Sequence, residues 1–161
     1  MREKILSMLE SNAKLTAGEI AVYLDIPENT VAEEIKKMEK EQIICGYGTF
    51  VNWELTDSEF LTALIEVKVT PSRGEGFNRI AERIYRFDEV KAVYLMAGSY
   101  DLTVIIEGKS IKEISHFVSE KLSPLESILG TATHFVLKKY KDHGVIFGGQ
   151  NEEDERMIIS P

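Results

Sequence analysis

Several features that would point to common functional classes are missing from this sequence of 161 residues. A single cysteine, Cys45, rules out an internal disulfide and a cysteine-rich metal site. No apolar run approaches the roughly 20 residues that a membrane-spanning helix needs. The N-terminus begins an amphipathic pattern rather than a targeting segment. We therefore expect a cytoplasmic protein without a membrane partner.

Recognisable catalytic patterns are also missing from the sequence. It contains no P-loop, no Ser/His/Asp arrangement and no motif of paired carboxylates. Its histidines, His116, His134 and His143, lack the close spacing of metal ligands, so a surface or sheet position is the simpler interpretation for each. The sequence predicts no catalytic residue, no metal site and no cofactor.

Positive charge is scarce as well. The net charge is −8, and residues 1–53 carry six Lys or Arg against nine Asp or Glu. Proteins that bind nucleic acid usually present a basic surface to the phosphates, so the overall charge argues against such a partner. The hydrophobic share of 43% and the charged share of 29% are ordinary for a globular protein. The length allows one large domain or two small ones.

The first part of the chain has the pattern of three short helices. Apolar residues at helical spacing predict a helix over 2–12, and Thr16-Ala17-Gly18-Glu19 fits a capping box at the start of a second helix. Asp25-Ile26-Pro27 ends the second helix, because a proline disfavours helical geometry in the residue before it. A third helix is expected from about Glu28 to Glu41.

Strand-forming residues around Gly46 and Gly48 indicate a small β-hairpin within 43–53. Three helices followed by such a wing, over 1–53, predict a winged helix-turn-helix, whose third helix enters the DNA major groove. A three-helix bundle that never contacts DNA would show the same spacing, so both interpretations stay open at this point.

The second part of the chain alternates between strand and helix patterns. Residues 54–60 are polar and predict a linker. The elements expected after it are a strand over 61–70, a helix over 77–85, two strands that meet at Gly98, a helix over 110–122 and a strand over 128–140. This β-α-β-β-α-β order over 61–141 predicts an α+β ferredoxin-like domain with both helices on one face of its sheet. The other face needs a cover, so we expect a homodimer.

The last twenty residues, 142–161, form an expected C-terminal tail. Two apolar segments, Val145-Ile146-Phe147 and Met157-Ile158-Ile159, lie on either side of the acidic run 152–155. A hairpin added to a sheet edge and a frayed end both fit this pattern.

The corner between the two central strands has the chemistry of a small binding site. Strand-forming residues run into Gly98-Ser99 and resume at Tyr100. The glycine is expected to adopt a backbone angle that other residues resist. Asp101 offers a carboxylate for an ammonium group, and N–H groups at the corner offer donors for a carboxylate, as a zwitterion requires. A hairpin in which Asp101 only caps the turn is the simpler alternative.

The order and spacing of short motifs over residues 1 to about 143 resemble the Lrp/AsnC family of leucine- and asparagine-responsive regulators. The matching pieces in the first part are Ile5-Leu6-x-x-Leu9, Asn12-Ala13-Lys14-Leu15-Thr16, Glu19-Ile20-Ala21, Thr30-Val31, Ile35-Lys36-Lys37-Met38-Glu39 and Ile43-Ile44-Cys45-Gly46-Tyr47. Those in the second part are Val90-x-x-Val93-Tyr94, Ala97-Gly98-Ser99-Tyr100-Asp101 and the Thr131/Thr133 segment that leads to Val136-Leu137.

This resemblance implies an amino-acid-sensing transcription factor that binds double-stranded DNA. It also implies dimers formed through the ferredoxin-like domain, which often assemble into octamers, with the effector between dimers. By the same resemblance Gly98, Ser99 and Tyr100 would line the effector pocket and Asp101 would face the ammonium group. Thr131 and Thr133 would supply hydroxyl groups. Effector binding would then favour one assembly and change operator affinity.

The expected DNA-binding face departs from the family pattern. The family's recognition helices commonly follow a Ser and carry an Arg before the Ile35 position, where this chain has Pro27 and Glu34. Together with Glu28 and Glu33, these residues should repel phosphates or interrupt the helix. The residues expected to contact DNA are Lys14, Thr16, Asn29, Thr30, Lys36 and Lys37, with Lys40 as a further backbone contact. Several weak heads in one symmetric assembly would bind together.

Two other functions stay open from the sequence alone. The chain is similar in architecture to haem-pathway decarboxylases, which use histidines at the substrate, and His134 lies on the predicted sheet. An acidic third helix would suit such an enzyme. A ligand-sensing oligomer that does not bind DNA is the second alternative.

Overall fold

The computed structural model describes residues 1–71 and 73–148. Its residues group into two units, the first over 1–50 and the second from Val51 onward. No helix among the described residues is long and apolar enough to cross a membrane.

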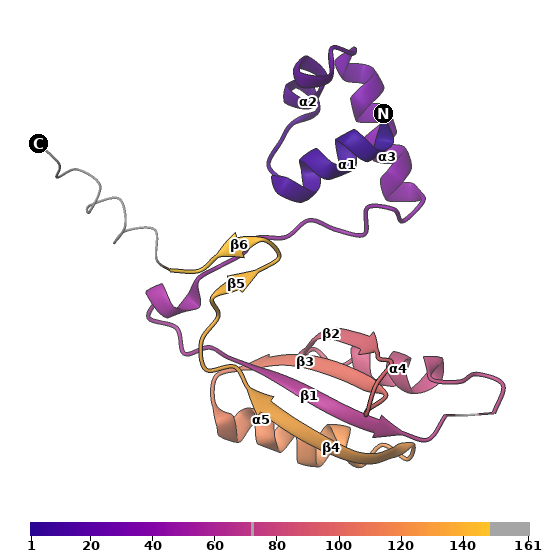
Figure 1. Ribbon diagram of the computed structural model, residues 1–161, viewed down its shortest axis with the longest axis vertical. Helices are drawn as coiled ribbons and strands as arrows, with labels where there is room; N and C mark the ends of the chain where they lie inside the picture. Colours follow the sequence, from indigo (N-terminus) through magenta and orange to yellow (C-terminus); the bar gives the residue numbers. More distant parts are fainter. Residues whose placement is uncertain (72, 149–161) are drawn as a thin grey trace, which may run out of the picture. The chain divides into compact units, whose positions relative to one another are not determined.

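The first unit contains the three expected helices, α1 (Arg2–Ser11), α2 (Ala17–Leu24) and α3 (Glu28–Lys40) (Figure 1). Each helix buries its apolar side chains against the other two, since the burial of apolar surface is the main force that holds short helices together. The buried residues are Ile5, Leu9, Ile20, Ala21, Val31 and Met38. The expected apolar face of each helix is therefore confirmed.

A tight turn joins α2 to α3. Asp25 ends α2 in the left-handed conformation, with a φ of 55°, and the N–H of Ile26 donates to the carbonyl of Ala21. Pro27 has a φ of −63° and stands directly before α3, where its lack of an N–H leaves no helical hydrogen bond unmade. These two helices and their turn confirm the helix-turn-helix prediction.

The predicted wing does not form. Residues 45–52, all of them described, contain no strand, and a short 3₁₀ helix, η1 (Trp53–Leu55), follows them. Tyr47, Phe50 and Val51 remain 53%, 46% and 38% exposed, so the segment has no core to pack on. A two-stranded hairpin is marginal without such support.

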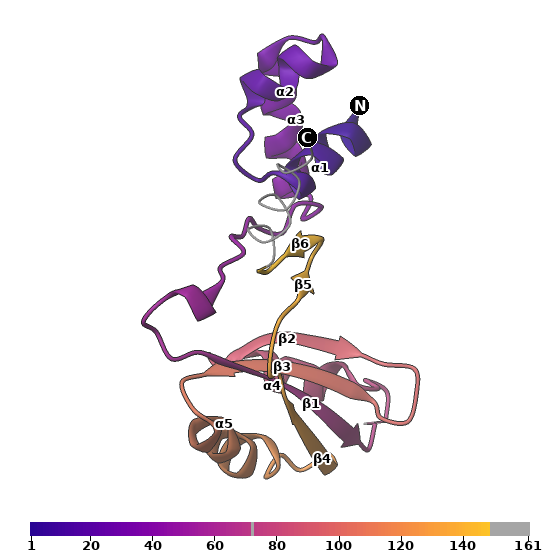
Figure 2. The ribbon, with the colours of Figure 1, turned by 60° about the vertical axis from the view of Figure 1, so that its left-hand side comes forward.

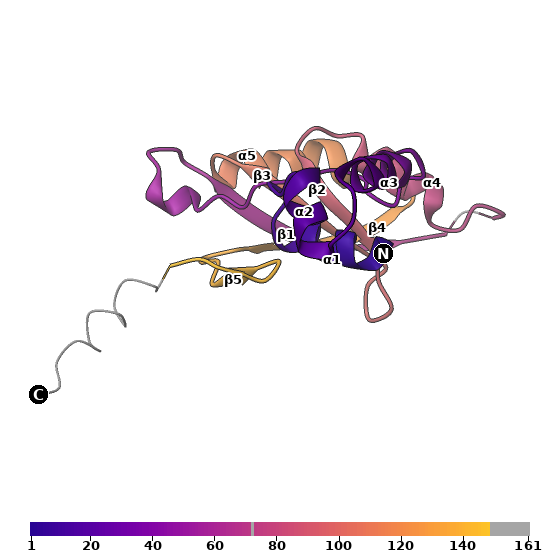
Figure 3. The same cartoon turned by 90° about the horizontal axis from the view of Figure 1, so that it is seen from above.

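The second unit contains the predicted β-α-β-β-α-β order. Its elements are β1 (Leu61–Val69), α4 (Asn78–Tyr85), β2 (Val90–Leu95), β3 (Leu102–Gly108), α5 (Ile111–Phe117) and β4 (Ile128–Phe135). The strands form an antiparallel sheet in the order β2-β3-β1-β4. Both helices lie on the same side of this sheet (Figure 3). The ferredoxin-like prediction is confirmed.

The two faces of the sheet differ in burial. The helix-covered face contributes the core, in which Ala63, Ile65, Val67 and Val69 of β1 pack with apolar residues of the neighbouring strands and of both helices. The register aligns two rows of residues on the opposite face. They are Tyr94, Thr103, Glu66 and Ala132 in one row and Ala92, Ile105, Leu64 and His134 in the other. The structure covers one face only.

Two elements are shorter than the sequence predicted. The last strand, β4, ends at Phe135 instead of Tyr140. Its partner β1 starts at Leu61, so the last hydrogen bond between them runs from the N–H of Val136 to the carbonyl of Thr62. The helix expected over 110–122 ends at Phe117 and continues as a π-helical turn, η2 (Val118–Leu122). The wider turn buries both Phe117 and Leu122 in the core.

The chain continues after β4 into a small hairpin. An extended connection leads to β5 (Lys141–Asp142) and β6 (Val145–Ile146), as Figure 2 shows. His143 and Gly144 form its turn with φ values of 46° and 81°, which suit a tight hairpin. The other apolar segment expected in the tail, 157–159, and the acidic run lie outside the described residues.

Candidate DNA-binding and effector-binding sites

The exposed face of α3 presents most of the residues expected to contact DNA. Asn29, Thr30, Lys36 and Lys37 are all exposed, while Val31 and Met38 on the opposite side of the helix are fully buried. Lys36 follows Asn29 by seven positions and precedes Lys40 by four, so the three side chains share one side of the helix. The helix therefore offers amide, hydroxyl and ammonium groups on one surface.

The other two expected DNA contacts lie in the turn before α2. Lys14 is exposed, and its backbone N–H donates to Oδ1 of Asn12 at 3.0 Å. The hydroxyl of Thr16 accepts from the N–H of Glu19 and donates to its carboxylate, as the capping box predicts. The N–H of Thr16 donates to the same carboxylate and lowers the pKa of Glu19. Thr16 therefore has a structural role at the start of α2.

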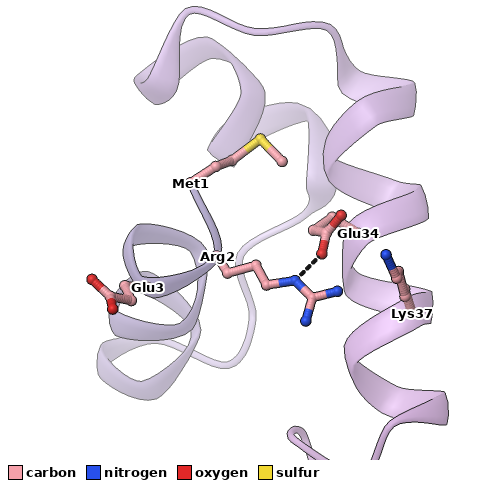
Figure 4. A pocket seen from close by; sticks show the side chains of 5 residues that line it. All are labelled: Met1, Arg2, Glu3, Glu34 and Lys37. Atoms are coloured by element: carbon pink, nitrogen blue, oxygen red, sulfur yellow. Dashed lines mark hydrogen bonds and ion pairs between the residues drawn. The ribbon is translucent and has the colours of Figure 1, made fainter.

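The acidic residues of α3 do not all lie on its exposed face. Glu34 accepts a hydrogen bond from Nε of Arg2, on the side of α3 that faces the start of α1 (Figure 4). Nη1 of Arg2 donates to Glu41 at 2.8 Å, which lowers the pKa of Glu41 below its usual range. The charge of Glu34, which the sequence placed on the DNA-binding face, is therefore paired within the unit.

In the second unit, the corner between β2 and β3 spans residues 96–101. Asp101 holds it to the sheet through three hydrogen bonds: its Oδ2 accepts from the N–H of Val69 at 2.8 Å, its N–H donates to the carbonyl of Val67 at 3.0 Å, and its carbonyl accepts from the N–H of Met96 at 2.8 Å. Asp101 is half-buried. These bonds agree with the simpler interpretation, in which Asp101 caps the turn, and its second carboxylate oxygen adds further acceptor capacity.

The expected role of the glycine at this corner is wrong. Gly98 is not among the residues with a left-handed φ, and a Cβ built on it meets no atom within 4 Å. The corner is wide enough to reverse the chain without a special backbone angle. Gly98 and Ser99 are exposed and Tyr100 is half-buried, and the ammonium group of Lys68 donates to the carbonyl of Ser99 at 2.7 Å.

The two threonines of β4 lie at different distances from this corner. Val67 of β1 pairs with Thr131 of β4 on one side and with Leu102 of β3 on the other. Thr131 is therefore two strands away from Leu102, the residue after Asp101. Two strand spacings amount to about 10 Å. Thr133 pairs with Ile65 and lies further along the strand. Both are half-buried on the helix-covered side of the sheet.

Sequence reasoning missed Arg2 and Lys68. Arg2 is separated from Glu34 by 32 positions and from Glu41 by 39, and Lys68 is 31 positions from Ser99. No local pattern reports such contacts.

Comparisons with known proteins agree with this geometry. A family model described as Lrp/AsnC ligand binding domain matches residues 62–146, and one described as winged helix-turn-helix DNA-binding matches residues 1–44. The fold and these matches define a DNA-binding transcriptional regulator with a helix-turn-helix unit and a ligand-binding unit. The chain belongs to the Lrp/AsnC family.

Individual relatives are similar over nearly the whole chain. The HTH-type transcriptional regulator YugG of Bacillus subtilis is 48% identical over 159 residues, 98% of this chain and 95% of that protein. The HTH-type transcriptional regulator Ptr1 of Methanocaldococcus jannaschii is 31% identical, over 86% of this chain and 91% of that protein. A transcriptional regulator of Neisseria meningitidis in complex with L-Met has a TM-score of 0.69 and 23% identity, over 86% of this chain and 89% of that one. These names agree with a regulator and not with an enzyme.

The hydrogen bonds of Asp101 generate a prediction about stability. Asp101→Ala leaves the N–H of Val69 without its acceptor, and we expect a loss of about 1–3 kcal/mol of unfolding free energy. Asp101→Asn keeps an oxygen that can accept from this N–H, so its loss of unfolding free energy should be smaller. Urea unfolding followed by circular dichroism measures both variants. Equal unfolding midpoints for wild type and Asp101→Ala would contradict a structural role.

Proposed function

We propose that this Lrp/AsnC regulator binds duplex DNA through the exposed face of α3 and responds to an amino acid bound near Gly98–Asp101. The observation that carries the DNA part is the separation of charges on α3: Lys36 and Lys37 are exposed, whereas Glu34 is paired with Arg2. Asn29 and Thr30 would read base edges or phosphates at the start of the helix. Lys14 and Thr16 would contact the backbone beside it.

The proposed effector is an amino acid because the corner combines groups that suit a zwitterion. Asp101 provides a carboxylate for the ammonium group, and the exposed backbone of Gly98 and Ser99 provides donors for the carboxylate. Tyr100, Thr131 and Thr133 would complete the pocket with hydroxyl groups. The L-Met complex of the Neisseria meningitidis regulator supports this class of effector.

The proposed assembly is a homodimer that covers the face of the sheet opposite the helices, and dimers of this kind can assemble further. Leu64, Ala92 and Ile105 are only partly buried on that face, and Tyr94 is 50% exposed. A second copy of the same face would bury them, which is the usual outcome for an apolar surface of this kind. Two DNA-binding heads would then act together in the cytoplasm.

The DNA-binding face is tested by removing its charges. Removal of one phosphate contact should flatten the slope of log K against log salt by about 0.9, so Lys36→Ala with Lys37→Ala should flatten it by about two per head. A gel shift or fluorescence anisotropy series with the DNA upstream of the protein's own gene measures this. Lys112→Ala, on α5, is the matched control. An unchanged slope in the double variant would contradict the proposed face.

The effector site is tested by thermal shift with a panel of amino acids. A ligand at about 100 times its Kd stabilises a protein by about 2.7 kcal/mol, so one or more amino acids should raise the melting temperature of the wild type. Asp101→Asn should abolish this shift, because it removes the charge that faces the ammonium group. Asp88→Asn, an exposed position, should keep it. A full shift in Asp101→Asn would exclude Asp101 as the ammonium partner.

The dimer is tested by placing a charge on the uncovered face. Tyr94→Glu would bury a carboxylate between two copies, so we expect the dimer to dissociate into monomers in sedimentation velocity. Tyr85→Glu changes a residue that is 56% exposed on α4 and should remain a dimer. Wild type that sediments as a monomer would overturn the proposed assembly.

A further inference from the structure

Arg2 binds two carboxylates with one guanidinium group, that of Glu34 in α3 and that of Glu41 directly after it. Its Nε donates to Glu34, while Nη1 and Nη2 donate to the two oxygens of Glu41 at 2.8 and 3.4 Å (Figure 4). The hydrogen bonds raise the pKa of Arg2 and lower that of Glu41, Glu41 being the larger influence on Arg2. The planar guanidinium suits this arrangement, since it presents several donors in a fixed geometry.

Lys37 is the competing partner of the same carboxylates. It lines the shallow depression that also contains Arg2 and Glu34 (Figure 4). It follows Glu34 by three positions and precedes Glu41 by four, the spacings at which side chains pair along a helix. Its charge also contributes to the lowered pKa of Glu41. Within the part of the chain that the structure describes, however, Lys37 makes no salt bridge, whereas Arg2 pairs with both carboxylates.

Another acidic residue of α3 has a hydrogen-bond partner but keeps its charge. Glu39 accepts a hydrogen bond from the hydroxyl of Tyr47 at 2.8 Å. Glu28, Glu33 and Glu39 are then the exposed carboxylates of α3 without an ion pair among the described residues, against the ammonium groups of Lys36, Lys37 and Lys40. With Glu34 paired to Arg2, the three exposed carboxylates of α3 are balanced by its three exposed ammonium groups.

We propose that Arg2 is a positioning residue for DNA binding: it sequesters Glu34 and Glu41 and thereby keeps Lys37 available for a DNA phosphate. This inference rests on the proposed DNA-binding role of α3. Without Arg2, Lys37 pairs with its two neighbours on the helix and the carboxylates face the phosphates. Arg2 itself makes no contact with DNA.

The experiment compares DNA affinity and its salt dependence in a set of variants of the full chain, with a random-sequence duplex as probe. Arg2→Met should flatten the salt slope by about 0.9 per head and weaken binding about eightfold per head at 0.1 M salt, as expected when one phosphate contact is removed. Arg2→Met combined with Glu34→Gln and Glu41→Gln should restore both values, because neither of the residues that Arg2 pairs with then carries a charge to capture Lys37. Lys4→Met removes an equal charge from an exposed position of α1 and should change neither value appreciably.

The same set separates the alternatives. Binding that stays weak in the triple variant would overturn the inference, because a direct phosphate contact by Arg2 predicts no rescue. Wild-type affinity in Arg2→Met would also overturn it. If circular dichroism shows that Arg2→Met does not fold, Arg2→Lys takes its place in the experiment. One ammonium group holds the two carboxylates less completely than a guanidinium does, so Arg2→Lys should give an intermediate salt slope. A wild-type salt slope in Arg2→Lys counts against the inference.

Failure of the proposed DNA-binding face has a different signature. The double variant Lys36→Ala with Lys37→Ala would then bind the probe as wild type does. This result would contradict both the proposed DNA-binding face and the role of Arg2. A normal effect of that double variant together with an unrescued Arg2→Met would overturn the role of Arg2 alone.

Discussion

The sheet of the second unit is covered by helices on one face only, and this asymmetry separates its core from the face proposed for the dimer. The alternation of side chains along β1 sends Ala63, Ile65 and Val67 into the core, so Leu64 and Glu66 must face the other way. A one-residue slip would exchange the two faces, which fixes the register strongly. The uncovered face carries apolar residues with polar ones between them, a composition suited to a second copy of the chain.

The proposed link between effector and assembly follows from where Asp101 is anchored. Its carboxylate bonds the N–H of Val69, at the end of the central strand β1, and its own N–H bonds Val67. An ammonium group that attracts this carboxylate would therefore act on the end of the strand that lies between β3 and β4. The same residue serves the fold and the proposed site, so its loss is expected to affect both. Comparing alanine with asparagine at this position separates the two effects.

Local patterns in the sequence predicted the elements whose causes are local. The capping box at Thr16, the turn at Pro27 and the alternation along β1 each depend on residues a few positions apart. Elements that depend on distant partners were predicted less well. The last strand stops at Phe135 because β1 starts at Leu61, and the expected wing lacks a core to pack on. Neither limit can be seen from the residues of the segment itself.

In the candidate sites too, features with local causes were predicted and contacts between distant residues were not. The exposure of Lys36 and Lys37 followed from helical periodicity, whereas the partner of Glu34 is at the opposite end of the unit's sequence. A count of charges treats Glu34 and Glu41 as repelling DNA, but both lie against one guanidinium. Because screening limits exposed charges to about 8 Å at physiological salt, a phosphate on α3 responds to the local arrangement and hardly to the net charge of the chain. Arg2 alone pairs with two of the carboxylates near Lys37, and a count of charges along the sequence does not show this.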